Sequence, residues 1–297
     1  MYEETLVGVV VPAYNEADFI GKVIDSVPEF VDRLYVVDDA STDDTWAEIK
    51  AHAEAEAAAK AEAEAEVETN VLPEAGPGTG RTDGGFTVSA FPDDQPEFDE
   101  TIVPVQHAEN RGRGGAVKTG YQMAMAEDID VVAVMDGDGQ MDGDILDRMI
   151  DPVVNGEADY AKGNRLVSPD HWEEMSNWRL FGNAVLTVLT KISSGYYGMR
   201  DPQNGYTAVS VEALRDISVG QLYEGYGFLN DMLVRLSRHQ KRIVDVPMKA
   251  IYNDAESGIQ YRSFVPYLSW LLLTMYCWRV WALIRTQASR LTYNTAG

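Results

Sequence analysis

The feature that most constrains the fold is a repeated alternation of short apolar runs with longer helix-forming segments. Four such runs occur, at residues 5–11, 34–37, 102–105 and 130–135. The helices expected to follow them cover residues 16–27, 46–68, 113–126 and 143–154. This order is typical of βαβ units around a mostly parallel sheet. We therefore predict an α/β fold whose functional residues follow the carboxyl ends of the strands, where such sheets bind ligands.

The acidic charge of the chain is unevenly distributed. The 297 residues have a net charge of −24, and residues 41–101 alone hold 16 Asp or Glu against 3 Lys or Arg. Within them, residues 46–68 are mostly Ala and Glu and predict a solvated helix, whereas the Gly- and Pro-rich residues 69–100 predict a loop without chemistry. We treat residues 46–100 as an acidic insertion.

The composition also bears on the partners and the setting of the protein. A surface this negative repels phosphate, which argues against nucleic acid as a partner. Carboxylates are abundant and Arg outnumbers Lys by 16 to 8, a pattern that predicts a salt-adapted protein from a halophile, with an ordinary acidic protein as the alternative. One Cys and an acidic start without a long apolar run predict a cytoplasmic setting.

The end of the chain has the opposite bias. No Asp or Glu follows Glu256, and residues 264–284 are apolar and aromatic with a single charge, Arg279. The stretch has the length of a membrane span, but Arg279 and Pro266 argue against a regular transmembrane helix. Its Trp and Tyr residues are favoured at membrane interfaces, so we expect an interfacial helix. A buried core helix and an oligomer contact are the alternatives.

Polar motifs follow the first two strands. In the first, Pro-Ala-Tyr-Asn-Glu, we expect Pro12 to end the strand and Asn15 to cap the next helix. In the second, Asp38 and Asp39 precede a run of Ser, Thr and Asp residues that suits a helix start. Ionised carboxylates only accept hydrogen bonds, so this pair suits contacts to base N–H groups or ribose hydroxyls.

The third and fourth strands are followed by a glycine-rich turn and by an Asp-Gly-Asp triplet. The turn, residues 110–116, lets the backbone approach a neighbour or a phosphate, but its spacing matches neither dinucleotide-binding nor P-loop patterns. Asp136 and Asp138 can hold one divalent cation, Mg²⁺ or Mn²⁺, which prefers such oxygen ligands. An EF-hand calcium loop is disfavoured because Met141 and Asp147 occupy the positions where that loop needs Gly and Glu.

Together and in this order, the four motifs resemble the family 2 glycosyltransferases, which have a nucleotide-sugar-binding GT-A fold. Later motifs, at residues 163–165, 179–183 and 201–206, resemble the branch that makes dolichyl-phosphate mannose and glucose. The resemblance covers about residues 5–260 apart from the insertion. It implies a GT-A-like, Rossmann-type, mostly parallel sheet with flanking helices, to which the apolar composition of residues 264–284 adds a C-terminal apolar helix. Residues 1–257 would form the glycosyltransferase domain, and residues 258–297 a basic, aromatic, membrane-interfacial end.

The resemblance also implies a reaction and a role for each matching residue. The enzyme, a hexosyltransferase, would transfer a sugar with inversion from a UDP- or GDP-sugar to a polyprenyl (dolichyl) phosphate, with Mg²⁺ or Mn²⁺, at the cytoplasmic face of the membrane. The nucleotide sugar would contact Pro12, Tyr14, Glu16, Val37, Asp39, Asp136, Gly137 and Gln140. The metal would bind Asp136 and Asp138, and the acceptor phosphate Arg165, Arg179 and Asn183. Asp138, Arg165 and Arg179 would be the catalytic residues.

Three alternatives and one departure from the family stay open. If the acceptor were a sugar hydroxyl, a base would be needed and Asp231 would be the best candidate. A sugar nucleotidyltransferase could share the α/β fold and the metal, but it needs a Gly-rich, basic loop after its first strand, where this chain has Pro-Ala-Tyr-Asn-Glu. A non-catalytic nucleotide-sugar-binding protein is the third alternative. Related synthases carry an Arg and a Lys in a late loop that closes on the diphosphate, and residues 252–258 here contain neither. Lys249 or Arg262 would have to take over that role.

Overall fold

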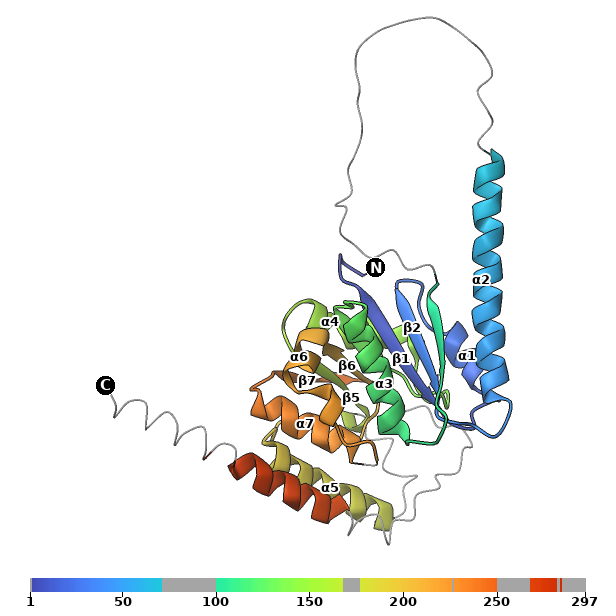
Figure 1. Cartoon of the computed structure of the whole chain (residues 1–297). Coiled ribbons are helices and arrows are strands. Elements are labelled where there is room, and N and C mark those ends of the chain that lie inside the picture. Colours follow the sequence, from blue (N-terminus) through green and yellow to red (C-terminus); the bar gives the residue numbers. More distant parts are fainter. Residues whose placement is uncertain are drawn as a thin grey trace, which may run out of the picture.

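The computed structural model describes residues 2–70, 100–167, 177–225, 227–249, 268–281 and 284, and its centre is a seven-stranded sheet (Figure 1). The strand order is β3-β2-β1-β4-β6-β5-β7. Strand β6 pairs antiparallel with β4 and β5, and the other pairs are parallel. The strands are β1 (Val7–Ala13), β2 (Arg33–Asp38), β3 (Ile102–Gln106), β4 (Val131–Val134), β5 (Tyr160–Asn164), β6 (Thr207–Ser210) and β7 (Ile243–Pro247). The predicted α/β fold with a mostly parallel sheet is confirmed.

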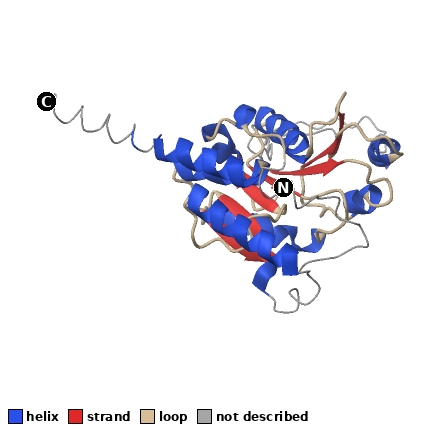
Figure 2. Cartoon of the chain, turned by 90° about the horizontal axis from the view of Figure 1, so that it is seen from below, coloured by secondary structure: helices blue, strands red, loops and turns tan. Residues whose placement is uncertain are grey.

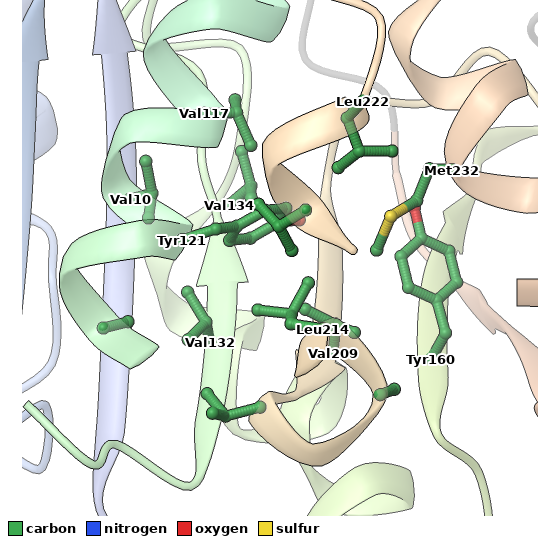
Figure 3. Close-up of a cluster of buried hydrophobic side chains, with 14 of the residues drawn as sticks. Val10, Val117, Tyr121, Val132, Val134, Tyr160, Val209, Leu214, Leu222 and Met232 are labelled. Atoms are coloured by element: carbon green, nitrogen blue, oxygen red, sulfur yellow. The ribbon is translucent and has the colours of Figure 1, made fainter. Parts of the chain in front are cut away.

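Helices cover both faces of this sheet, so the body has three layers (Figure 2). They are α1 (Ile20–Asp25), α2 (Thr45–Asn70), α3 (Arg113–Ala126), α4 (Leu146–Val154), α6 (Val211–Asp216) and α7 (Phe228–Arg238), and a further helix, α5 (Asn177–Ser194), packs on α7. One core lies between the sheet and α3, α6 and α7, and includes Val10, Tyr121 and Leu214 (Figure 3). The other lies on the opposite face, where Val9 and Val11 pack with residues of α1 and α4. Strand β1 thus contributes alternate residues to both cores.

Two sequence predictions at the first strand end are wrong. Pro12 does not end β1 but pairs within it, opposite Val37. Its missing N–H is tolerated because β1 pairs with β4 only as far as Val10, so no ladder bond is needed on that side. Asn15 does not cap α1, whose N-cap is Phe19. Asn15 has φ +56° instead, and its side chain accepts a hydrogen bond from the Thr42 N–H at 2.8 Å.

The Ala/Glu-rich segment forms the long helix α2, as predicted, and extends away from the body (Figure 1). Ile49 near its start is fully buried, whereas residues 58–62 are exposed. Glu56 holds the helix to the edge strand β3, because its carboxylate accepts hydrogen bonds from the N–H groups of Thr101 and Ile102 at 3.1 and 2.8 Å. The loop predicted for residues 69–100 lies outside the described residues except at its two ends.

Residues 268–281 form a helix that lies beside α5 (red in Figure 1). One face packs on α5 and α7 through a cluster that contains Leu186, Val234 and Leu272. Arg279 donates hydrogen bonds to the carbonyls of Ser194 and Ile192 at the end of α5, at 2.7 and 3.0 Å, where helix carbonyls lack partners within the helix. Within the described ranges, no helix is long and apolar enough to cross a membrane.

We predict that Glu56→Ala lowers the free energy of unfolding by about 1–3 kcal/mol, because two N–H groups at the start of β3 lose a charged acceptor. Chemical denaturation monitored by circular dichroism measures the change. Glu54→Ala, on the exposed side of the same helix, is the matched control and should change stability by less than about 0.5 kcal/mol. Equal effects of the two variants would contradict this account of α2.

Candidate active site

The strand-end motifs meet at one edge of the sheet because β2, β1 and β4 are neighbours. Two backbone hydrogen bonds join them directly. The Asp39 N–H donates to the Ala13 carbonyl at 2.8 Å, and the Gly137 N–H donates to the Pro12 carbonyl at 3.1 Å. These bonds join three of the motifs, and the Arg111 N–H joins the glycine-rich turn to them through Asp39 Oδ1 at 2.9 Å, so the four motifs lie together at the carboxyl ends of the parallel strands.

A carboxylate cluster formed by Glu16, Asp136 and Asp138 lies at the centre of this edge. Burial and the negative charges of Asp138 and Asp136 raise the pKa of Glu16 to about 7. Burial and the charge of Asp136 also raise the pKa of Asp138, which accepts a hydrogen bond from the Gln140 N–H at 2.9 Å. Mutual repulsion of this kind is relieved when a cation binds.

Arg113, at the first position of α3, balances part of this charge. Its Nε lies 2.6 Å from Asp136 Oδ1, and one Nη donates to the Gly205 carbonyl at 3.1 Å. A Cβ atom at Gly205 would lie 2.5 Å from an Nη of Arg113 and 2.7 Å from Asp136 Oδ2, so a larger residue would displace this pair. No role was predicted for Arg113 from the sequence. The available signal was its position at a helix start, within the glycine-rich turn that follows β3.

The donor set fits Mg²⁺ or Mn²⁺ bound together with a phosphate ligand. Within the described ranges, no group of three or more His, Cys, Asp or Glu side chains is arranged to hold a metal ion. Two carboxylates, Asp136 and Asp138, are hard oxygen ligands, and such sites commonly take their remaining ligands from substrate phosphates and water.

The second strand end holds one carboxylate in a fixed position. Asp39 is 2% exposed, and its Oδ1 receives two hydrogen bonds. One comes from His107 Nδ1 at 2.7 Å and the other from the Arg111 N–H at 2.9 Å. His107 is itself oriented by Thr119, 2.9 Å from Nε2. Asp38 is buried and accepts from the Ser41 N–H and from Gln106 Nε2, so it stabilises the turn.

The glycine-rich turn packs against a neighbouring loop. A Cβ atom at Gly114 would lie 2.4 Å from the Glu224 carbonyl oxygen, so only glycine permits this approach. Arg111 and Lys118 donate to the Glu224 carboxylate at 2.7 and 2.9 Å, and these hydrogen bonds lower the pKa of Glu224. The predicted close approach of the turn to a neighbouring part of the protein is therefore observed at Gly114, and its approach to a phosphate stays a prediction.

Arg165 lies on the other side of Gly205, just after β5. The Asp201 carboxylate accepts hydrogen bonds from Arg165 Nε at 2.8 Å and from one Arg165 Nη at 3.2 Å. The Arg165 side chain is 37% exposed, whereas that of Asp201 is 6% exposed. This bidentate pair fixes the plane of the guanidinium at the site. Arg179 and Asn183 belong to α5, but their side chains lie outside the described part of the structure, as does the late loop at residues 252–258.

The remaining predicted residues differ in their access to the site. Tyr14 is 46% exposed, whereas Pro12 is buried and Val37 is fully buried in the core. Asp231 is 7% exposed, and its Oδ2 accepts hydrogen bonds from the Tyr223 N–H at 2.9 Å and from Arg235 Nε at 3.0 Å. These contacts hold the loop before α7 in place.

Comparison with known protein families identifies the family to which the chain belongs. Residues 8–66 and 89–218 match the family described as Glycosyl transferase family 2. The chain belongs to this family. It is therefore a glycosyltransferase, as the motifs predicted, and the residues of the carboxylate cluster lie within the matched ranges.

Named relatives come from archaea and bacteria. A UDP-N-acetylglucosamine–dolichyl-phosphate N-acetylglucosaminyltransferase of Methanococcus voltae is 31% identical, over 84% of this chain and 88% of the relative. An undecaprenyl-phosphate mannosyltransferase of Micrococcus luteus is 27% identical, over 80% of this chain and 81% of the relative. Among solved structures, glucosyl-3-phosphoglycerate synthase of Mycobacterium tuberculosis with Mn²⁺ and UDP has a TM-score of 0.55 at 18% identity, over 93% and 80% of the two chains. This last similarity concerns the fold.

We predict that Glu16→Gln stabilises the unliganded protein at pH 8 and not at pH 5. The pKa of Glu16 is raised from 4.5 to about 7, so the folded state retains a proton that the unfolded state releases. Stability is therefore lost as the pH rises from about 4.5 to 7, and Gln removes that loss. Because Glu16 is only partly buried, we expect a gain of about 2–5 °C in Tm at pH 8.

Thermal scans at both pH values measure this effect. Asp18→Asn, which neutralises an exposed carboxylate two residues away, is the control and should leave Tm within about 1 °C at either pH. A gain for Glu16→Gln that is the same at pH 5 and pH 8 would show that the charge of Glu16 is not its origin.

Proposed function

We propose that this enzyme transfers a sugar, with inversion, from a UDP-sugar to a polyprenyl phosphate with Mg²⁺ or Mn²⁺. The proposal rests mainly on one observation, that two groups of charged residues lie close together at the same edge of the sheet. One is the carboxylate cluster of Glu16, Asp136 and Asp138, and the other is Arg165 held by Asp201. The relatives named as dolichyl-phosphate and undecaprenyl-phosphate glycosyltransferases support the acceptor class.

Asp136 and Asp138 would hold the metal ion, beside Gly137 and Gln140. When bound, the ion supplies positive charge that stabilises the leaving nucleoside diphosphate. Arg113 keeps Asp136 in place through its 2.6 Å contact, so the carboxylate is oriented before the donor arrives. Glu16, whose pKa is raised to about 7, adds negative charge that favours binding of the cation.

The hydrogen bonds of Asp39 support uracil as the base of the donor. Both bonds from His107 and Arg111 reach Oδ1, and no described residue donates to Oδ2. One acceptor oxygen matches the single N–H of uracil, whereas the guanine edge offers N–H groups from two neighbouring nitrogens and would use both carboxylate oxygens. Tyr14, which is exposed, would complete the pocket wall, with the buried Pro12 and Val37 packed behind it.

The acceptor would bind at Arg165, together with Arg179 and Asn183. A guanidinium gives bidentate hydrogen bonds to phosphate oxygens, and Asp201 holds that of Arg165 in a fixed orientation. A phosphate is already ionised at neutral pH, so its attack on the anomeric carbon, opposite the diphosphate, needs no general base. This agrees with the position of Asp231, whose carboxylate is 7% exposed and paired with Arg235.

The decisive experiment incubates the enzyme with Mn²⁺, polyprenyl phosphate and labelled UDP- or GDP-sugars. We expect labelled lipid in the organic phase from UDP-sugars. Asp138→Asn should lower turnover by about 100-fold or more, because it removes a carboxylate ligand of the metal ion that would stabilise the leaving diphosphate. Asp144→Asn, an exposed neighbour in the same loop, should leave turnover unchanged. Label on a water-soluble product alone, or full activity of Asp138→Asn, would refute the proposal.

We further propose that the enzyme works at the cytoplasmic face of the membrane, held there by residues 258–297 acting with the catalytic domain of residues 1–257. The helix at 268–281 presents an exposed stripe opposite its packed face. Trp270 is 68% exposed, Leu273 51% and Trp281 55%. Helix α5 adds Val188 and Ile192, 55% and 42% exposed, four residues apart on one side. Neither helix contains Asp or Glu, although the chain has a net charge of −24.

We predict that Trp270→Glu with Leu273→Glu lowers binding to vesicles of phosphatidylcholine and phosphatidylglycerol by about 10-fold or more, since two apolar side chains no longer enter the interface. Vesicle flotation measures the bound fraction. Ala58→Glu with Ala61→Glu adds the same charge to exposed positions of α2 and should not change binding. Equal flotation of wild type and the Trp270/Leu273 variant would rule out this surface. Both variants keep the hydrophobic cluster that holds the helix at 268–281 on α5 and α7. A truncated chain without this helix would expose the cluster and is therefore a poorer test.

A further inference from the structure

The loop at residues 201–205 connects the two proposed subsites. At its start, Asp201 binds Arg165 through both carboxylate oxygens, at 2.8 and 3.2 Å. At its end, the Gly205 carbonyl accepts a hydrogen bond from Arg113, which in turn binds Asp136. The loop has few residues, so a displacement at one end is transmitted to the other.

Lys162 lies buried beneath this loop. It is on β5 and is 0% exposed, and its ammonium donates a hydrogen bond to the carbonyl of Asn204, next to Gly205. Its ammonium interacts electrostatically with four charged groups, the carboxylates of Asp201 and Asp245 and the guanidinium groups of Arg113 and Arg165. Burial lowers the pKa of Lys162 to about 7, and the charge of Asp201 opposes that shift.

A buried ammonium in this position is costly unless it is paired and hydrogen-bonded. An apolar side chain would fill the same space on β5 without that cost. What Lys162 supplies, and an apolar residue cannot, is a donor to the Asn204 carbonyl and a positive charge beside Asp201. Both act on the loop that separates the subsites.

We propose that Lys162 is a positioning residue that fixes the 201–205 loop and thereby the spacing between Asp136 and Arg165. This inference rests on the proposed function, which assigns donor and acceptor to those two residues. Transfer requires the acceptor oxygen to face the anomeric carbon at close range, and a misplacement of about 1 Å can cost about 100-fold in rate. Lys162 touches neither substrate and acts through the loop.

The test is the kinetics and amide exchange of Lys162→Met, with Lys241→Met as matched control. Lys241 is also a largely buried lysine, paired with Asp216 at 2.7 Å next to β7, but it lies at the opposite edge of the sheet. We expect Lys162→Met to lower kcat by about 10- to 100-fold while KM for each substrate changes by less than about threefold. Lys241→Met should lower Tm without lowering kcat of the folded enzyme.

Hydrogen exchange tests the loop independently of the reaction. The N–H groups of Asn204 and Tyr206 bond within the loop, to the Asp201 carbonyl and to Asn204 Oδ1. Their exchange should be at least 10-fold faster in Lys162→Met and unchanged in Lys241→Met. If Lys162→Met does not fold, Lys162→Gln, which keeps a donor without the charge, takes its place.

A double-mutant cycle with Asp201→Asn completes the test. Because both residues act on one loop, the double variant should lose clearly less than the product of the single losses. The inference would be overturned if Lys162→Met left kcat or the exchange of the loop unchanged. It would also be overturned if the loss of kcat in the double variant equalled the product of the two single losses. A wild-type enzyme that labels no lipid would instead refute the proposed function, while the exchange data would still decide the role of Lys162.

Discussion

The organisation of the site depends on how the negative charge of Glu16, Asp136 and Asp138 is held at one sheet edge. Arg113 pairs with Asp136, and the repulsion that remains raises the pKa of Glu16 and of Asp138. The unliganded fold therefore keeps carboxylates closer together than is favourable for its stability. A divalent cation with a diphosphate would offset this repulsion, so the charge that weakens the free protein would strengthen binding of the proposed donor.

In the sheet formed by the described residues, the antiparallel direction of β6 explains why the proposed acceptor subsite lies beside the proposed donor subsite. Because β6 runs opposite to β4 and β5, the chain enters it at the edge where those two strands end. The loop before β6 therefore lies between the residues that follow β4 and those that follow β5. Asp201 and Gly205 occupy that loop and contact Arg165 and Arg113. A wholly parallel sheet would have placed this loop at the opposite edge.

The sequence was sufficient to predict what depends on local pattern. Helix α3 has the predicted bounds, and the strand-end motifs meet as the parallel sheet requires. Predictions that depended on tertiary contacts did not hold: Asn15 binds the turn at Thr42 instead of capping α1. Arg113, His107 and Lys162 were missed for the same reason, because each is defined by a partner on another element. No periodicity or spacing encodes such partners.

The contacts of α5 link the proposed lipid-facing surface to the acceptor side of the site. Thr190 of α5 donates to Asn230 Oδ1 at 2.7 Å, and Gln203 of the 201–205 loop donates to the same oxygen at 3.3 Å. The helix at 268–281 is fixed to α5 by Arg279, and its Trp278 lies 4.6 Å from the Arg238 guanidinium of α7. A chain of contacts thus connects the exposed apolar stripe to the loop that holds Arg165. A lipid phosphate presented at that surface would meet a guanidinium already oriented by Asp201, which favours transfer at the membrane over transfer in solution.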